Sequence, residues 1–97
     1  MNPNIKLYSK FSLGTRVMGF LSYPIAGTVT KIWHEQGRAF YEITYSNEKF
    51  RLEEKFLRPF EPAFWYSVLE KWNEYLRVGL LQQQLLHEIV EMLRPVR

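Results

Sequence analysis

The sequence contains no cysteine. This absence excludes a disulfide framework, a zinc site held by thiolates and a cysteine nucleophile within the chain. It is typical of cytosolic proteins, and we expect a cytoplasmic location. Long apolar runs are lacking too: no stretch approaches the roughly 20 residues of a membrane span, and the first residues show no apolar core of signal-peptide length. We therefore expect a soluble protein.

Catalytic motifs are also lacking. There is no glycine-rich phosphate loop, no HExxH pair and no serine elbow. Glu53 and Glu54 are adjacent, so in an extended segment their carboxylates point apart rather than flank one bond. His87 and Glu91 have the spacing of a solvated helix pair, which is a commoner arrangement than a two-ligand metal site. We expect a non-catalytic protein with no metal and no cofactor.

What is present is a core rich in large side chains. Of the 97 residues, 46% are apolar and 16% aromatic, which is enough for one domain. The net charge is +3. Residues 1–60 hold nine Lys and Arg against five Glu, and residues 61–97 hold four against five, so the first part is basic. These charges are interspersed, which is typical of an ordinary protein surface.

Residues 11–60 show the pattern of short β-strands, after a polar tail over residues 1–10. The alternation is clearest at 39–46, where Tyr41, Ile43 and Tyr45 share one face. The other strands are expected over 14–21, 26–34, 49–53 and 57–60, with turns at Gly37 and Asn47 and a 3₁₀ turn over 53–56. Five short strands are compatible with a small barrel, which has no exposed strand edges.

From Pro62 onward the spacing of apolar residues becomes helical, so residues 61–97 are expected to form a helical extension. An unbroken helix of this length would run roughly 48 Å, at about 1.5 Å per residue, which a small barrel cannot cover. Either the chain bends near Gly79 and folds back, or the excess apolar stripe packs against another chain. We favour the second, because Leu80 and Leu81 follow Gly79 at once and leave little room for a connection.

Four segments carry a resemblance to a known class of domain: Gly14–Val17 "GTRV", Ala26–Ile32 "AGTVTKI", Tyr41–Tyr45 "YEITY" and Arg51–Pro59 "RLEEKFLRP". Together they resemble SH3-like barrels of the Tudor, chromo-barrel and KOW type. The resemblance implies a non-catalytic domain that binds peptides, modified residues, nucleic acid or a larger enzyme, often between the first two strands and along one barrel edge. Some members hold a methylated amine in an aromatic cage. Rings for such a cage could come from Tyr23, Trp33, Phe40 and Tyr45, which do not match the cage positions one for one.

The sequence thus predicts an α+β fold, a five-stranded SH3-like β-barrel over residues 11–60 followed by a long C-terminal amphipathic helix. We expect a small adaptor or regulatory protein that binds another protein through the barrel and uses the helix to dock or dimerise. Candidate partner contacts are aromatic side chains at the barrel mouth and apolar positions of the helix: Phe20, Tyr23, Trp33, Tyr45, Leu81, Leu85, Leu86, Ile89 and Leu93. The alternative for each of them is core packing, in the barrel end or under a helix bent at Gly79.

A second hypothesis is binding to nucleic acid. Its candidate phosphate contacts are the basic side chains of the barrel: Lys31, Arg38, Lys49, Arg51 and Arg58. Bases would stack on Trp33 or Tyr45. Glutamates interspersed among these residues would repel a phosphate backbone, so this hypothesis stays the alternative. No membrane contact is expected, because the polar face of the second part of the helix carries Gln and Glu rather than Lys and Arg.

Overall fold

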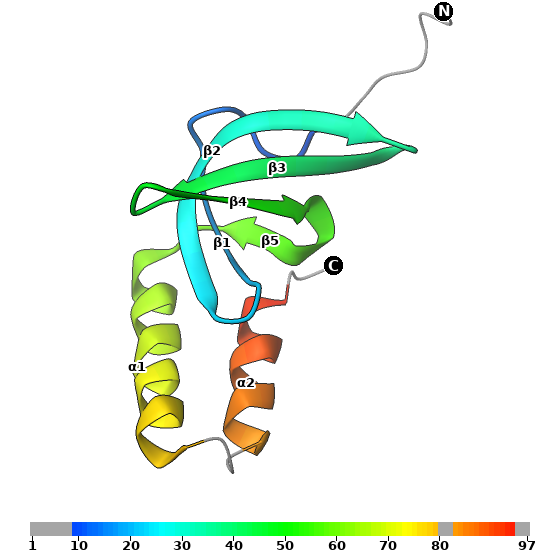
Figure 1. Cartoon of the computed structure of the whole chain (residues 1–97). Helices are drawn as coiled ribbons and strands as arrows, with labels where there is room; N and C mark the ends of the chain where they lie inside the picture. The colour runs from blue at the N-terminus through cyan, green and yellow to red at the C-terminus, as the bar shows by residue number, and fades with distance from the viewer. Residues whose placement is uncertain (1–8, 80–82, 95–97) are drawn as a thin grey trace, which may run out of the picture.

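The computed structural model describes residues 9–79 and 83–94 and confirms the α+β class (Figure 1). Its secondary structure begins with five antiparallel strands, which are followed by two C-terminal helices. The strands are β1 (Arg16–Phe20), β2 (Pro24–Glu35), β3 (Arg38–Tyr45), β4 (Glu48–Glu53) and β5 (Leu57–Pro59), with a 3₁₀ turn, η1 (Glu54–Phe56), before β5. The helices are α1 (Pro62–Val78) and α2 (Gln83–Leu93).

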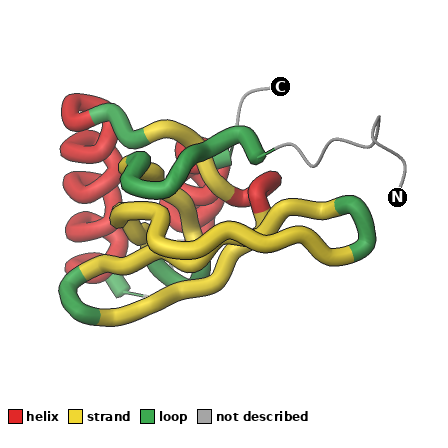
Figure 2. Tube along the Cα trace, turned by 90° about the horizontal axis from the view of Figure 1, so that it is seen from above, coloured by secondary structure: helices red, strands yellow, loops and turns green. Residues whose placement is uncertain are grey.

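Tight turns fix the register of the two central hairpins. Gln36 and Gly37 have φ values of 52° and 76°, and Ser46 and Asn47 have φ values of 52° and 66°. Two successive left-handed residues are typical of the type I′ turns that suit the twist of paired strands. The turns at Gly37 and Asn47 therefore lie where the sequence predicts them. The β2–β3 turn lies at the end of the sheet far from α1 (Figure 2).

Strand β2 bends, and this bend gives the sheet its shape. Its first half pairs with β1 as far as Thr28, and its pairing with β3 runs from Thr28 to Glu35 with a register shift between Val29 and Lys31. A bulge of this kind increases local twist and lets one strand serve two parts of a sheet. The concave side encloses a core that contains Val17, Val29 and Tyr41, together with Phe11, Ile25, Ala39, Ile43, Leu52 and Leu57.

The prediction of a closed barrel is wrong. The strands form one sheet of order β4-β3-β2-β1-β5, in which β4 and β5 are the two edges. Strand β5 runs only from Leu57 to Pro59 and pairs with β1. A strand this short, ending in a proline without an N–H, has little backbone left to form a ladder with β4 as well. The sheet therefore curls around its core but stays open between β4 and β5.

The preferred interpretation of the helical extension, one long helix, is also wrong. Helix α1 ends before Gly79, whose φ of 87° and ψ of 176° lie in a region that is essentially restricted to glycine. Helix α2 then lies beside α1, and both lie on one side of the sheet (Figure 1).

The helices pack on the convex side of the sheet around a second core. Met18 of β1 and Ala26 of β2 contact the helical side chains Trp65, Val68, Tyr75, Ile89 and Leu93, all of them buried. Arg58 of β5 joins this arrangement, because its Nη1 donates a hydrogen bond of 2.7 Å to the backbone carbonyl of Met92. A cation near the C-terminus of α2 also suits the dipole of that helix.

Candidate functional site

A groove lies where the sheet stays open. Three consecutive residues of β4, Arg51 to Glu53, line it together with Phe20 at the end of β1, Leu21 in the next loop, Phe40 of β3 and Phe56 of η1. Its volume is about 410 Å³, within the roughly 300–1,000 Å³ usual for ligand sites. Because most of the lining side chains are apolar and two are charged, the groove suits an apolar group with a polar neighbour.

Exposed apolar side chains surround this groove. Leu21 is 49% exposed and Phe56 is 50% exposed, and neither is part of either core. Tyr23 lies close by in the chain, with its ring 6.1 Å from that of Phe50 on β4 in an edge-to-face contact. Large apolar side chains that remain exposed at a hollow are typical of interaction sites. We therefore take these side chains and the groove as the candidate site.

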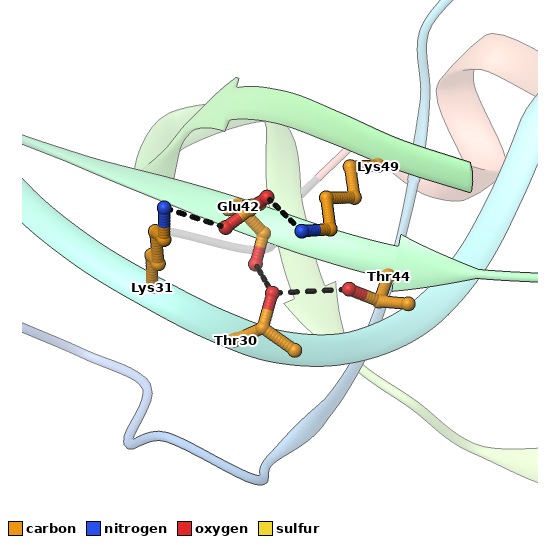
Figure 3. A network of polar contacts seen from close by, with 5 residues as sticks. All are labelled: Thr30, Lys31, Glu42, Thr44 and Lys49. Carbon is orange, nitrogen blue, oxygen red and sulfur yellow. Dashed lines mark hydrogen bonds and ion pairs between the residues drawn. The ribbon is translucent and has the colours of Figure 1, made fainter. Parts of the chain in front are cut away.

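The outer face of β2, β3 and β4 carries ion pairs next to the groove. Glu42 lies between Lys31 and Lys49, with its carboxylate oxygens 3.9 Å and 3.7 Å from the two Nζ atoms (Figure 3). Thr30 donates to the Glu42 backbone carbonyl and lies 3.0 Å from the Thr44 hydroxyl. These contacts hold the centre of the face in one arrangement across all three strands.

Arg51 connects this face to two aromatic rings. Its guanidinium lies 4.7 Å from the ring of Trp33 and 4.8 Å from that of Phe40, which are stacked on each other. It also donates a hydrogen bond of 3.0 Å to Glu35. Because Arg51 and Phe40 line the groove, these contacts fix one side of the site.

Cations dominate what this face presents to solvent. The five basic side chains paired there, Lys31, Arg38, Lys49, Arg51 and Lys55, are 52% to 71% exposed. Two of their three glutamate partners, Glu42 and Glu53, are only 13% and 12% exposed. With five positive charges against three negative ones, this set has an excess of +2. The recessed position of the carboxylates makes the face attractive to an anionic ligand.

Four of the five candidate phosphate contacts, Lys31, Arg38, Lys49 and Arg51, therefore share one face. Arg58 does not. Its side chain is 15% exposed and lies 4.1 Å from the ring of Phe64, with its Nη1 bonded to Met92. The structure thus gives Arg58 a role in holding α2 against the rest of the protein.

The candidate partner contacts divide into two groups. Phe20 lines the groove and also packs against the second core, Tyr23 and Tyr45 are exposed, and Trp33 lies on the outer face beneath Arg51. The helix positions lie within the second core or against it: Leu85, Leu86, Ile89 and Leu93. Leu81 lies outside the described residues. The sequence analysis did not name Phe56. Its position in a predicted 3₁₀ turn was the available signal, because a single turn of this kind buries an aromatic ring poorly and leaves it exposed for binding.

A polar network joins η1 to the start of the sheet. The Tyr41 hydroxyl donates to Glu54 Oε1 at 2.5 Å and accepts from the backbone N–H of Phe11 at 3.2 Å. The backbone N–H of Lys10 donates to the same Glu54 oxygen at 2.6 Å. Burial raises the pKa of the Tyr41 hydroxyl above its ordinary value of 10.0, and the hydrogen bond to Glu54 raises it further. The network positions η1, and with it Phe56 of the groove.

We expect Tyr41→Phe to lower the free energy of unfolding at neutral pH by about 1–3 kcal/mol, because it removes the hydrogen bond to Glu54 and leaves the buried backbone N–H of Phe11 without its acceptor. The folded protein holds the Tyr41 proton more tightly than the unfolded chain does. Its stabilisation is therefore fully present below about pH 10 and is lost as the pH rises through the raised pKa. Urea unfolding of the wild type and of Tyr41→Phe between pH 7 and 11 should show a smaller alkaline loss in the variant. The exposed Tyr66→Phe is the control, and equal alkaline losses in all three proteins would contradict this account.

Two further features of the described residues bear on the site. Within residues 9–79 and 83–94 there is no group of three or more His, Cys, Asp or Glu side chains placed to hold a metal ion. In the same ranges, no helix has the length and apolar character needed to cross a membrane.

Comparison of the chain with models of known protein families, with curated proteins and with solved structures finds no match. What can be said of its class comes from its own structure. It is a small α+β protein with a curled five-stranded sheet, a helical hairpin on the convex side and a groove at the open edge.

Proposed function

We propose that this protein is a small non-catalytic adaptor that binds another protein through the groove at the open edge of its sheet. The observation that carries the proposal is the lining of the groove, where Phe20, Leu21 and Phe56 surround a hollow of about 410 Å³. Aromatic and apolar anchors in a desolvated pocket supply most of the energy in protein–protein interfaces. The cytoplasmic location expected from the sequence stays part of the proposal.

We further propose that the five-stranded sheet is an SH3-like fold whose barrel is not closed. Support comes from the residues that carry the resemblance, since Val17, Val29, Ile43 and Leu57 lie in one core. The 3₁₀ turn before a short last strand supports it too. Self-association through α2 is left out, because Ile89 and Leu93 are buried against the same chain.

A cross-linking experiment in the organism that makes the protein tests this function. p-Benzoylphenylalanine replaces Phe56 in the groove or, as a control of equal chemistry, Tyr66 on the exposed side of α1. Illumination should give a discrete cross-linked protein from position 56 and none from position 66. Equal products from both positions, or cross-links from position 66 alone, would overturn the proposal.

Nucleic-acid binding is the second candidate, and the exposed cations over recessed carboxylates favour it. If it is correct, the affinity for a single-stranded oligonucleotide falls steeply with added salt, as counterion release requires. Lys49→Gln would then weaken binding uniformly across sequences, whereas Arg58→Gln would act only through stability. Absence of binding at low salt would remove this candidate.

A further inference from the structure

We infer that the groove takes an extended, acidic segment of the partner protein, which adds to the free edge of β4 and places apolar side chains in the groove. This inference rests on the proposed function and names the binding mode and the chemistry of the partner. Three independent features carry it: the unpaired side of β4, the position of the groove along it and the charge beside it.

Strand β4 is paired on one side only. Its register with β3 runs from Tyr45–Glu48 to Phe40–Glu53, and in the described part of the sheet it has no second neighbour. In an antiparallel pair, alternate residues direct their N–H and C=O groups away from the partner strand. Part of the β4 backbone is therefore free to form a new ladder, and peptide recognition by strand addition uses such edges.

The groove follows the same strand. Arg51, Leu52 and Glu53 are consecutive in β4 and all line it, so a chain paired with β4 would lie along the groove. Side chains of an extended peptide alternate between two faces. Every second residue of the peptide would therefore be directed toward Phe20, Leu21 and Phe56, and the residues between would face outward.

Charge selects the partner. The cations of the outer face are more than half exposed, while two of their three carboxylate partners, Glu42 and Glu53, are nearly covered and the third, Glu35, is 55% exposed. Carboxylates of the peptide would lie close to Lys49, Arg51 and Lys55, so an acidic sequence is complementary and a basic one is not. A second copy of this protein carries the same positive excess on this face and is a poorer occupant.

Synthetic peptides test the inference on the full chain. The probe is a fluorescein-labelled, end-capped peptide of alternating Glu and Leu, and its match has Lys in place of Glu. Two more versions carry N-methyl groups on the odd or on the even backbone nitrogens. We expect the acidic peptide to bind at least tenfold more tightly than the basic one. Because a strand pairs through alternate residues, one methylated version should lose at least tenfold in affinity and the other less than threefold.

Variants of the protein locate the binding. Phe56→Ser should lower the affinity for the acidic peptide at least tenfold. The double variant Lys49→Gln/Lys55→Gln should lower this affinity at least threefold and reduce its dependence on salt. The exposed Tyr66→Ser is the control and should leave affinity unchanged. Thermal unfolding by circular dichroism checks that every variant is folded.

Several results would overturn the inference. If the basic peptide binds as tightly as the acidic one, the partner segment is not acidic. If the two methylated peptides bind equally, the peptide does not pair with β4 as an added strand. Displacement of the peptide by a single-stranded RNA oligomer of similar charge that binds more tightly would favour nucleic acid instead. If no peptide binds while position 56 still cross-links to a protein, the inference fails and the proposed function stands. Loss of the cross-link would remove the function itself.

Discussion

Gly27→Ala is expected to lower the free energy of unfolding by about 3 kcal/mol or more, the upper end of the range for overpacked positions. A Cβ atom at Gly27 would lie 2.4 Å from the backbone oxygen of Thr44 and 2.7 Å from the Ile43 side chain. Backbone cannot move aside cheaply, so the bend of β2 against β3 would have to open. Urea unfolding of the wild type and the variant measures the difference.

The matched control for Gly27→Ala is Lys31→Ala, an exposed position on the same strand. Its ion pair with Glu42 is on the surface, so its removal should cost less than about 1 kcal/mol. A Gly27→Ala protein as stable as the wild type would show that β2 does not approach β3 this closely. The shape of the open sheet, and the groove along it, would then need revision.

Ile89→Ala is expected to cost about 2–5 kcal/mol, as truncation of a fully buried aliphatic side chain does. Ile89 is 0% exposed and lies in the second core with Trp65 and Val68. The control is Leu76→Ala on α1, which is 58% exposed and should change stability by less than about 0.5 kcal/mol. Thermal or urea unfolding distinguishes the two. Equal stabilities would mean that α2 does not pack on the sheet.

The local elements could be predicted from the sequence because each depends on neighbouring residues. Alternation placed Tyr41 and Ile43 on the inner face of β3, where both are buried. Gly37 and Asn47 marked the two turns because they tolerate the left-handed backbone. The 3₁₀ turn and the short last strand followed from the spacing after Glu53.

Long-range arrangement could not be predicted in the same way. Whether β4 pairs with β5 depends on how far β2 bends and on how short β5 is. Neither the bend nor the strand length can be predicted from a local sequence pattern. The fold-back of α2 depends on Gly79 adopting a backbone that only glycine favours, while the neighbouring leucines resembled a continuous helix. Ile89 then packs in one core with Met18 of β1, which is far away in the chain. This contact covers the apolar stripe of the helical extension for which the sequence analysis expected a partner chain.

The candidate site shows the same division. Phe20, Tyr23 and Trp33 could be named from their position in strands and loops. Phe56 could not, because its membership of the groove requires η1 to be held by the contact between Tyr41 and Glu54. Arg58 was grouped with the surface cations by charge alone, yet its hydrogen bond to Met92 places it against α2.

The most direct test of the central claim is the affinity of the protein recovered by cross-linking at position 56, measured by calorimetry against three versions of this chain. Phe56→Ser should weaken binding about tenfold or more, which is about 1.4 kcal/mol or more, as loss of an interface anchor does. Tyr66→Ser should stay within about twofold of the wild type, since its ring is exposed on the far side of α1 from the core. Equal affinities for the wild type and Phe56→Ser, or a loss with Tyr66→Ser instead, would contradict the assignment of the groove as the working surface.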